Sequence, residues 1–161
     1  MSFVYIDLEA SGLGPDSYPI EVAWKDSADG SSDNFLIDPA RVEGWDYWDE
    51  FAEELHGIAP EDLAGQLCAR ESARRLNRSL LGRKVISDAL EFDSFWMRRL
   101  FAAAEMKPSF DLVGLEHVLA AEQLVQYRMI AKTQLRRHRA MRDVEDLMKA
   151  VSLVLGESLT G

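Results

Sequence analysis

The stretch that decides the fold is FVYIDLEASGLG, residues 3–14. It starts with β-branched and aromatic residues that favour a strand, and it ends in a glycine-rich turn signal. Asp7 and Glu9 lie at the far end of this strand, where acidic residues are unfavourable and are rarely buried without a partner. Because alternate residues of a strand point to one face, the two carboxylates lie together and repel each other unless a cation or a proton separates them.

This carboxylate pair has two explanations at this point. Hard oxygen ligands of this kind suit Mg²⁺ or Mn²⁺, which predicts a metal site. A charged strand end that faces solvent explains the pair equally well. The Asp-x-Glu pattern alone does not decide, because it recurs at Asp143 and Glu145, where helical spacing places the two side chains on different faces.

The strand is the first of three that are predicted to form an antiparallel meander. Turn-rich segments separate it from strands at 19–25 and 34–39. Residues 41–66 are acidic and aromatic, and they predict irregular chain with a short helix. The later segments are helices at 67–82, 92–106, 114–134 and 140–155 and short strands at 84–90 and 109–115. The sequence therefore predicts one α/β domain over residues 1–161, with a mixed central sheet flanked by helices.

The composition is that of a globular protein, with 47% hydrophobic and 29% charged residues among 161. No apolar run is long enough to span a membrane, and the N-terminus lacks the layout of a signal peptide. Cys68 is the single cysteine, so an internal disulfide is excluded. These features lead us to expect a cytoplasmic protein that makes no membrane contact.

Charge is distributed unevenly along the chain, although the formal net charge is −10. Residues 1–66 hold 16 acidic and 2 basic residues, whereas residues 67–142 hold 15 basic and 8 acidic residues. The cations of this middle region include Arg70, Arg74, Arg75, Arg78, Arg83, Lys84, Arg128, Lys132, Arg136, Arg137, Arg139 and Arg142. They either form solvated helix faces or bind a phosphate-rich partner, and the charge pattern permits both.

Two further signals follow later in the chain. Asp93 comes at the start of an aromatic-rich helix after a short strand, where its carboxylate either completes a metal site or caps the helix. His138 and Asp143 are five residues apart, which on a straight helix would not place them on one face. The spacing suits a histidine in the loop before the helix and an aspartate on the helix. Taken alone, His138 is equally well explained as a surface residue of a basic run.

Together the three signals resemble the DEDDh exonucleases, the DnaQ-like branch of the ribonuclease H-like fold. The likeness extends from about residue 3 to residue 151. YIDLEASGLGP resembles the first motif of the family, and it is close to the oligoribonuclease form of that motif. LHGIAPEDL resembles a segment that often follows the third strand in proofreading members.

The resemblance implies a metal-dependent 3′–5′ exonuclease acting on single-stranded DNA or RNA ends or on short oligonucleotides. Asp7, Glu9, Asp93 and Asp143 would hold two divalent ions, Mg²⁺ or Mn²⁺, with Asp7 bridging both. Two metals of this kind clamp the attacking and leaving oxygens of a phosphodiester.

The resemblance also implies roles for the residues around the metals. His138 would be the general base for the attacking water. Ala10, Ser11, Gly12 and Leu13 would seat the terminal nucleotide. Oligoribonuclease-like relatives form dimers, which makes a homodimer an open alternative.

The second motif departs from the family pattern. Members commonly carry a His-Asn pair shortly before the aspartate, where this chain has Ser87 and Asp88. Asp88 is therefore a rival for the role of Asp93. The departure also supports a second hypothesis, in which the chain is a catalytically weak or inactive nucleic-acid-binding or regulatory protein on the same fold.

Overall fold

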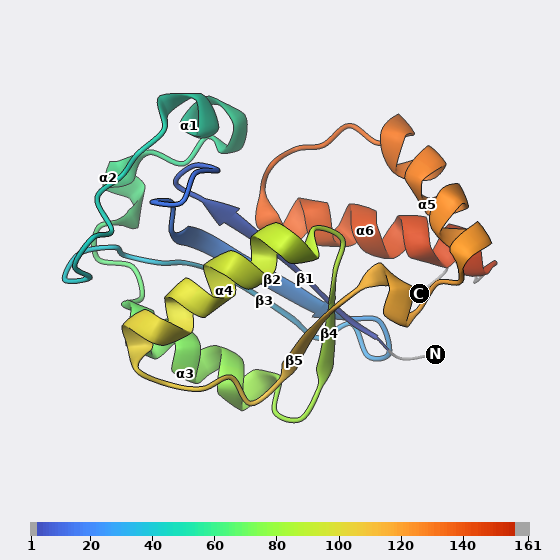
Figure 1. Cartoon of the computed structure of the whole chain (residues 1–161), viewed down its shortest axis with the longest axis horizontal. Coiled ribbons are helices and arrows are strands. Elements are labelled where there is room, and N and C mark those ends of the chain that lie inside the picture. The colour runs from blue at the N-terminus through green and yellow to red at the C-terminus, as the bar shows by residue number, and fades with distance from the viewer. Residues whose placement is uncertain (1–2, 157–161) are drawn as a thin grey trace.

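The computed structural model describes residues 3–156, which form a five-stranded mixed sheet covered by helices on both faces (Figure 1). The strands are β1 (Val4–Ala10), β2 (Pro19–Asp26), β3 (Ser32–Leu36), β4 (Lys84–Ser87) and β5 (Asp111–Gly114). The helices are α1 (Glu50–His56), α2 (Pro60–Leu63), α3 (Ala69–Ser79), α4 (Leu90–Ala104), the 3₁₀ helix η1 (Leu115–His117), α5 (Ala121–Thr133) and α6 (Ala140–Leu155). Within residues 3–156, no helix is both long enough and apolar enough to cross a membrane.

The sheet has the order β3-β2-β1-β4-β5. β1, β2 and β3 pair antiparallel, which confirms the predicted meander, and β4 runs parallel to both β1 and β5. β1 pairs with β4 only through Val4 and Tyr5. The carboxyl-terminal half of β1 therefore has a strand on one side only, and the other side is open to side chains from the helices.

Alternation along β1 divides the core between the two faces of the sheet. Val4, Ile6 and Leu8 pack with residues of α3 and α4 on one face. Tyr5 packs with residues of α5 and α6 on the other. This period of two is the pattern expected for a central strand covered on both faces.

The element boundaries differ from prediction at several elements. The strand expected over 84–90 ends at Ser87, because the chain turns there into the next helix. The strand expected over 34–39 is Ser32–Leu36, and the helix expected over 67–82 is Ala69–Ser79. Helix α4 was expected to begin at residue 92. It begins at Leu90, and Asp93 lies in its first turn. The segment 114–134 is broken, because η1 and α5 are separated by residues 118–120. Residues 41–66 contain two short helices, α1 and α2, where one was expected.

Candidate active site

The structure brings together the acidic residues that the sequence singled out. Asp7 and Glu9 come from β1, Asp93 from the first turn of α4 and Asp143 from the first turn of α6. Their carboxylates form two triads that share Asp7: one contains Glu9 and Asp143, and the other contains Asp88 and Asp93. Within each triad the ligand atoms all lie within 4.8 Å of one another.

Burial decides between the two explanations of the β1 carboxylates. The exposed fraction of Asp7 is 2%, and that of Asp93 is 1%. A strand end that faces solvent is therefore the wrong explanation for Asp7. Asp7 Oδ2 and Asp143 Oδ2 are buried and have no hydrogen-bond partner in the described part of the chain.

Asp93 does not cap its helix. The residue at the N-cap of α4 is Ala89, which supplies no side-chain hydrogen bond. The Ser87 hydroxyl instead donates to Asp93 Oδ2 over 2.6 Å, and this contact fixes the carboxylate toward Asp7. Asp88, the rival residue, accepts a hydrogen bond at Oδ2 from the Tyr127 hydroxyl at 3.1 Å. The structure thus places both Asp88 and Asp93 in the same triad.

The crowding of buried carboxylates changes their proton affinity. Burial, followed by the charges of Asp93, Glu9 and Asp143, raises the pKa of Asp7 well above its ordinary value. Burial raises the pKa of Asp93 to about 7. Burial and the neighbouring Asp143 raise the pKa of Glu9 to about 9. Burial and crowding thus favour the protonated forms of these groups unless cations neutralise them.

These triads fit divalent cations. All the donors are carboxylate oxygens, the ligand type that Mg²⁺ and Mn²⁺ prefer. Two of the oxygens are buried without a hydrogen bond, as expected for ligands whose partner is an ion. Asp7, as the shared member, is the residue that could contact cations on both sides.

The metal-free protein should lose stability as the pH rises from 6.5 to 8.5. In this window the folded chain keeps a proton on Glu9 that the unfolded chain has already released, because the pKa of Glu9 is about 9 when folded and about 4.5 when unfolded. Each such group lowers the free energy of unfolding by up to about 1.4 kcal/mol per pH unit, or roughly 2–3 kcal/mol across the window. Urea unfolding in EDTA at several pH values measures this slope. Glu9→Gln should flatten it, and a wild-type stability that increases with pH in EDTA would contradict the account.

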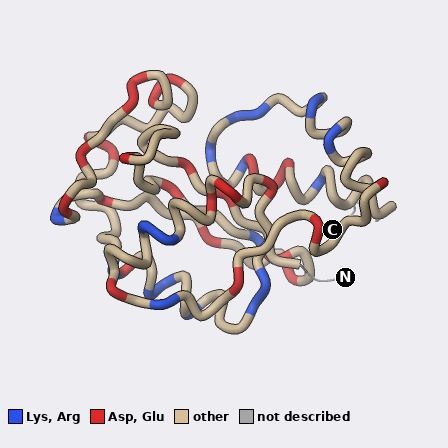
Figure 2. The backbone as a smooth tube through the Cα atoms, viewed as in Figure 1, with Lys and Arg blue, Asp and Glu red and all other residues tan. Residues whose placement is uncertain are grey.

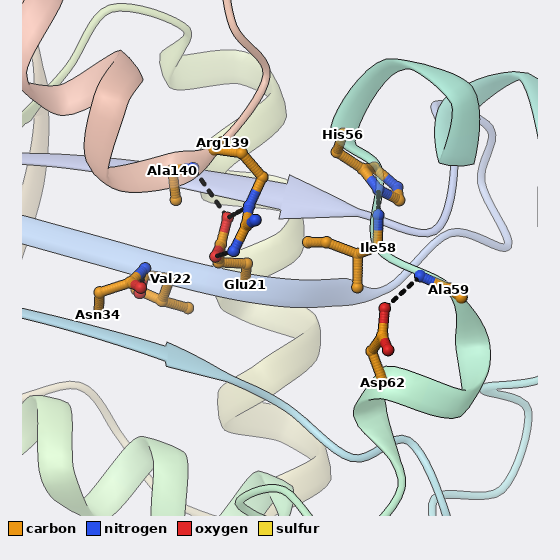
Figure 3. A network of polar contacts seen from close by, with 9 residues as sticks. All are labelled: Glu21, Val22, Asn34, His56, Ile58, Ala59, Asp62, Arg139 and Ala140. Atoms are coloured by element: carbon orange, nitrogen blue, oxygen red, sulfur yellow. Dashed lines mark hydrogen bonds and ion pairs between the residues drawn. The ribbon is translucent and has the colours of Figure 1, made fainter.

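His138 lies in the segment between α5 and α6, as its spacing from Asp143 predicted. Its backbone adopts the left-handed region, with φ of 56°, which is uncommon for a residue other than glycine. The next residue explains how this conformation is held. Arg139 donates from Nη2 and Nε to Glu21 at 2.7 and 3.2 Å, and the backbone N–H of Ala140 donates to Glu21 Oε1 at 2.8 Å (Figure 3).

Glu21 therefore anchors the start of α6 to the sheet. It lies on β2 with an exposed fraction of 1%, and Figure 3 shows its carboxylate between the Arg139 guanidinium and the Ala140 backbone. Three hydrogen bonds satisfy the two carboxylate oxygens, which is the condition under which a buried charge is tolerated. Because His138 directly precedes these residues, the anchor holds the backbone of the loop that carries it, and His138 lines the same pocket as Asp7 and Glu9.

The three histidines have different environments. The Ile58 backbone N–H donates to His56 Nδ1 over 3.0 Å, and burial lowers the pKa of His56. His56 is therefore neutral near pH 7 with its proton on Nε2, and it can donate but cannot take a proton there. His117 is exposed in η1, away from the carboxylates. His138, in contrast, lines the pocket beside the acid cluster.

A pocket of about 360 Å³ opens next to the carboxylates. Asp7, Glu9 and Asp93 form its acidic end. The remainder is largely apolar, and it includes four large side chains that are exposed at the surface: Leu13, Phe51, Leu55 and Phe92. An acidic end joined to an apolar wall suits a ligand that has both a phosphate and a flat base.

The loop after β1 forms part of this pocket. Ala10, Gly12 and Leu13 line it, whereas Ser11 is fully buried and its hydroxyl accepts from the Tyr18 backbone N–H at 3.2 Å. A Cβ on Gly12 would lie 2.8 Å from the Tyr47 ring, so glycine is required by this close approach. Three of the four predicted substrate residues thus line the pocket, and Ser11 supports the loop.

Several residues of the site had no signal in the sequence that we used. Glu21 and Arg139 are 118 residues apart, and neither belongs to a periodic pattern. In the sequence 40 residues lie between Phe51 and Phe92, and only the fold brings both side chains to the wall of one pocket. His56 lies in the LHGIAPEDL segment, whose resemblance to the family was the one available indication.

Comparison with known proteins gives a structural likeness but no sequence match. No protein-family model and no curated protein sequence matches the chain. A 3′-exonuclease solved in a study of 3′-end-specific recognition of a histone mRNA stem-loop superposes with a TM-score of 0.70 at 13% identity, covering 96% of this chain and 64% of that one. A full-length 3′-exonuclease gives 0.70 at 14%, covering 96% and 81%. The Mopeia virus exonuclease domain, in a form depleted of manganese, gives 0.52 at 15%, covering 96% and 77%.

The likeness shows the fold. This chain has the α/β fold of these two 3′-exonuclease structures over nearly its whole length, with the mixed sheet flanked by helices that the sequence predicted. It spans less than two thirds of the first of these neighbours.

Proposed function

We propose that the protein is a metal-dependent 3′–5′ exonuclease that removes nucleotides from the 3′ end of single-stranded nucleic acid. The observation that carries this proposal is the pair of carboxylate triads sharing Asp7 at the acidic end of an apolar pocket. The similarity of the fold to 3′-exonucleases supports it.

Glu9 and Asp143 would hold one divalent cation, Asp93 would hold the other, and Asp7 would hold both. Mg²⁺ or Mn²⁺ bound there would supply an activated water and neutralise charge on the transferring phosphate. The remaining work belongs to the protein. The buried carboxylates would hold the cations, and through them the phosphodiester, in a fixed position relative to His138.

His138 would accept the proton of the attacking water. Its place in the lining of the pocket, on a loop that Glu21 anchors at the next residues, supports this role. His56 cannot take this role, because its Nδ1 already accepts the Ile58 N–H.

The terminal base would lie among the apolar side chains of the pocket. Leu13 lies on the loop after β1, Phe51 on α1 and Phe92 on α4, so three separate elements offer surfaces to a base. Base stacking on aromatic side chains is worth about 1–3 kcal/mol per base and tolerates any sequence. This arrangement favours an end of single-stranded DNA or RNA.

The upstream strand would follow α5 and the segment that leads to α6. Figure 2 shows Lys and Arg on this path and again on α3. On α3, Arg74 and Arg75 form ion pairs with Glu71 and Asp33. Arg128, Lys132 and Arg137 on the α5 path are exposed and make no ion pair with residues 3–156, so they remain available to phosphates.

Cleavage of labelled oligonucleotides tests the proposal. With 5′-labelled DNA and RNA and Mg²⁺ or Mn²⁺, we expect a ladder that shortens from the 3′ end and is abolished by EDTA. Cleavage of oligonucleotides of two to five residues, compared with that of longer strands, tests the similarity of the first motif to oligoribonucleases. Sedimentation of the active species in an analytical ultracentrifuge tests the homodimer. Binding without shortening would contradict the enzyme and support a regulatory protein.

Asp93→Asn should reduce cleavage more strongly than Asp88→Asn. The Asp93 carboxylate is buried and fixed by Ser87, whereas Asp88 is partly exposed and shared with the Tyr127 hydroxyl. We expect losses of roughly 10²–10³-fold for Asp93 and about tenfold or less for Asp88. Single-turnover rates at saturating Mn²⁺ measure both. The reverse order would transfer the second-motif role to Asp88.

A further inference from the structure

One cation of the chain already lies inside the acid cluster. Arg136 Nη2 is 3.6 Å from Asp7 Oδ1, and Arg136 Nε is 3.5 Å from Asp143 Oδ2. Asp7 is the residue shared by both triads, and Asp143 belongs to one of them. The guanidinium therefore faces the same carboxylates that are assigned to the divalent cations.

The Arg136 side chain lines two cavities. Arg136 lines the large pocket with Asp7, Glu9 and Asp93. It also lines a smaller cavity of about 60 Å³ together with Asp88 and Asp143. No other Lys or Arg lines either cavity among residues 3–156.

The contacts of Arg136 are charge contacts without the geometry of a strong pairing. Guanidinium–carboxylate hydrogen bonds are about 2.7–2.9 Å long, and both distances here exceed that range. The Glu21–Arg139 pair three residues later shows the short bidentate form, at 2.7 and 3.2 Å. Arg136 therefore neutralises the cluster without being fixed in it.

The surroundings also allow Arg136 to leave. Its side chain is 49% exposed, and it belongs to the segment 134–139, which is neither helix nor strand. Withdrawal toward solvent would break no hydrogen bond of this side chain that the structure shows. Arg137, the next residue, is exposed and lines a groove between α5 and α6 away from the carboxylates.

We propose that Arg136 is an exchangeable counter-ion of the metal site, which competes with divalent cations for Asp7 and Asp143 and so sets their affinity. A dication held by these carboxylates would lie close to the guanidinium, because Arg136 Nε faces Asp143 Oδ2, an oxygen without a hydrogen bond, and like charges at that separation repel. Cation binding is therefore weakened for as long as the guanidinium stays beside the carboxylates. The inference rests on the proposed metal site, but it concerns binding and stability and does not depend on cleavage.

Isothermal titration of the whole chain with Mn²⁺ tests this inference. Arg136→Gln should bind Mn²⁺ roughly tenfold or more tightly than wild type, because the competitor is removed. In EDTA the same variant should melt roughly 3 °C or more below wild type, because the carboxylates lose their counter-ion. Arg136→Lys, which keeps the charge, should stay near wild type. Arg137→Gln is the matched control for the loss of one positive charge, and it should change neither value.

The outcomes separate this inference from the proposed function. An Arg136→Gln variant that binds Mn²⁺ no more tightly than Arg137→Gln overturns the inference, even if the enzyme cleaves normally. Tighter Mn²⁺ binding by Arg136→Gln in a chain that cleaves nothing supports the inference while the nuclease proposal fails. Absence of Mn²⁺ binding by every form contradicts both.

Discussion

Asp7→Asn should abolish cleavage while making the metal-free protein more stable. The activity should fall by roughly 10³-fold or more, about 4 kcal/mol, because Asp7 is the ligand shared by both triads. The stability of the metal-free chain at pH 8 should rise by about 1 kcal/mol or more. The reason is that burial and the neighbouring carboxylates raise the pKa of Asp7, whose exposed fraction is 2%, so the folded chain holds a proton that the unfolded chain has released at this pH, and asparagine removes that cost.

The opposite signs of these two effects make the test specific. Cleavage rates with Mn²⁺ and urea unfolding in EDTA measure them on the same preparation. Glu21→Gln is the matched control, since Glu21 is also buried but has its charge satisfied by Arg139 and Ala140. It should destabilise the fold. Retained activity in Asp7→Asn, or a loss of stability as large as that of Glu21→Gln, would contradict the role given to Asp7.

His138→Asn should reduce cleavage by about 10²–10⁴-fold, the usual contribution of a general base. Asparagine is the appropriate replacement because it tolerates the left-handed backbone that His138 adopts, with φ of 56°, whereas alanine would add strain. Mn²⁺ affinity and melting temperature should change little. Rates measured at saturating substrate separate an effect on the chemical step from an effect on binding.

His117→Asn is the control for the histidine substitution. His117 is exposed in η1 and does not line the pocket, so its replacement should leave the rate unchanged. A His138→Asn variant that cleaves as fast as His117→Asn would remove His138 from the mechanism.

Most of the fold follows from local pattern. The β-branched and aromatic residues near the start of the chain predicted the first strand of the meander, and the helical pattern of residues 140–155 predicted α6 with its observed bounds. The break between η1 and α5 has no such signal. Residues 118–120 are Val-Leu-Ala, which are compatible with a helix. The helix is nevertheless interrupted there, where Leu119 is buried in the apolar cluster that Tyr5 forms with residues of α5 and α6. Tertiary packing overrides local propensity there.

The start of α4 was missed for a related reason. A capping side chain usually marks the first turn, but Ala89 at the N-cap provides none. The sequence therefore suggested a helix that starts at residue 92, with Asp93 at its opening. The observed start, at Leu90, moves Asp93 into the first turn, where Ser87 rather than the helix backbone binds its carboxylate.

The acid cluster was predictable in its members but not in its environment. Strand spacing placed Asp7 and Glu9 on one face, and the loop position of His138 followed from its distance to Asp143. The counter-ions were not predictable. Arg136 and Arg139 lie in a run of similar cations, and only the fold shows that one faces the carboxylates while the other binds Glu21.

The central claim is that Asp7 joins two divalent cations, and anomalous diffraction from crystals grown with Mn²⁺ tests it most directly. We predict two anomalous peaks about 3.5–4 Å apart, both in contact with the Asp7 carboxylate, one also beside Glu9 and Asp143 and the other beside Asp93. Crystals that hold Mn²⁺ elsewhere on the protein and none at Asp7 would contradict the account.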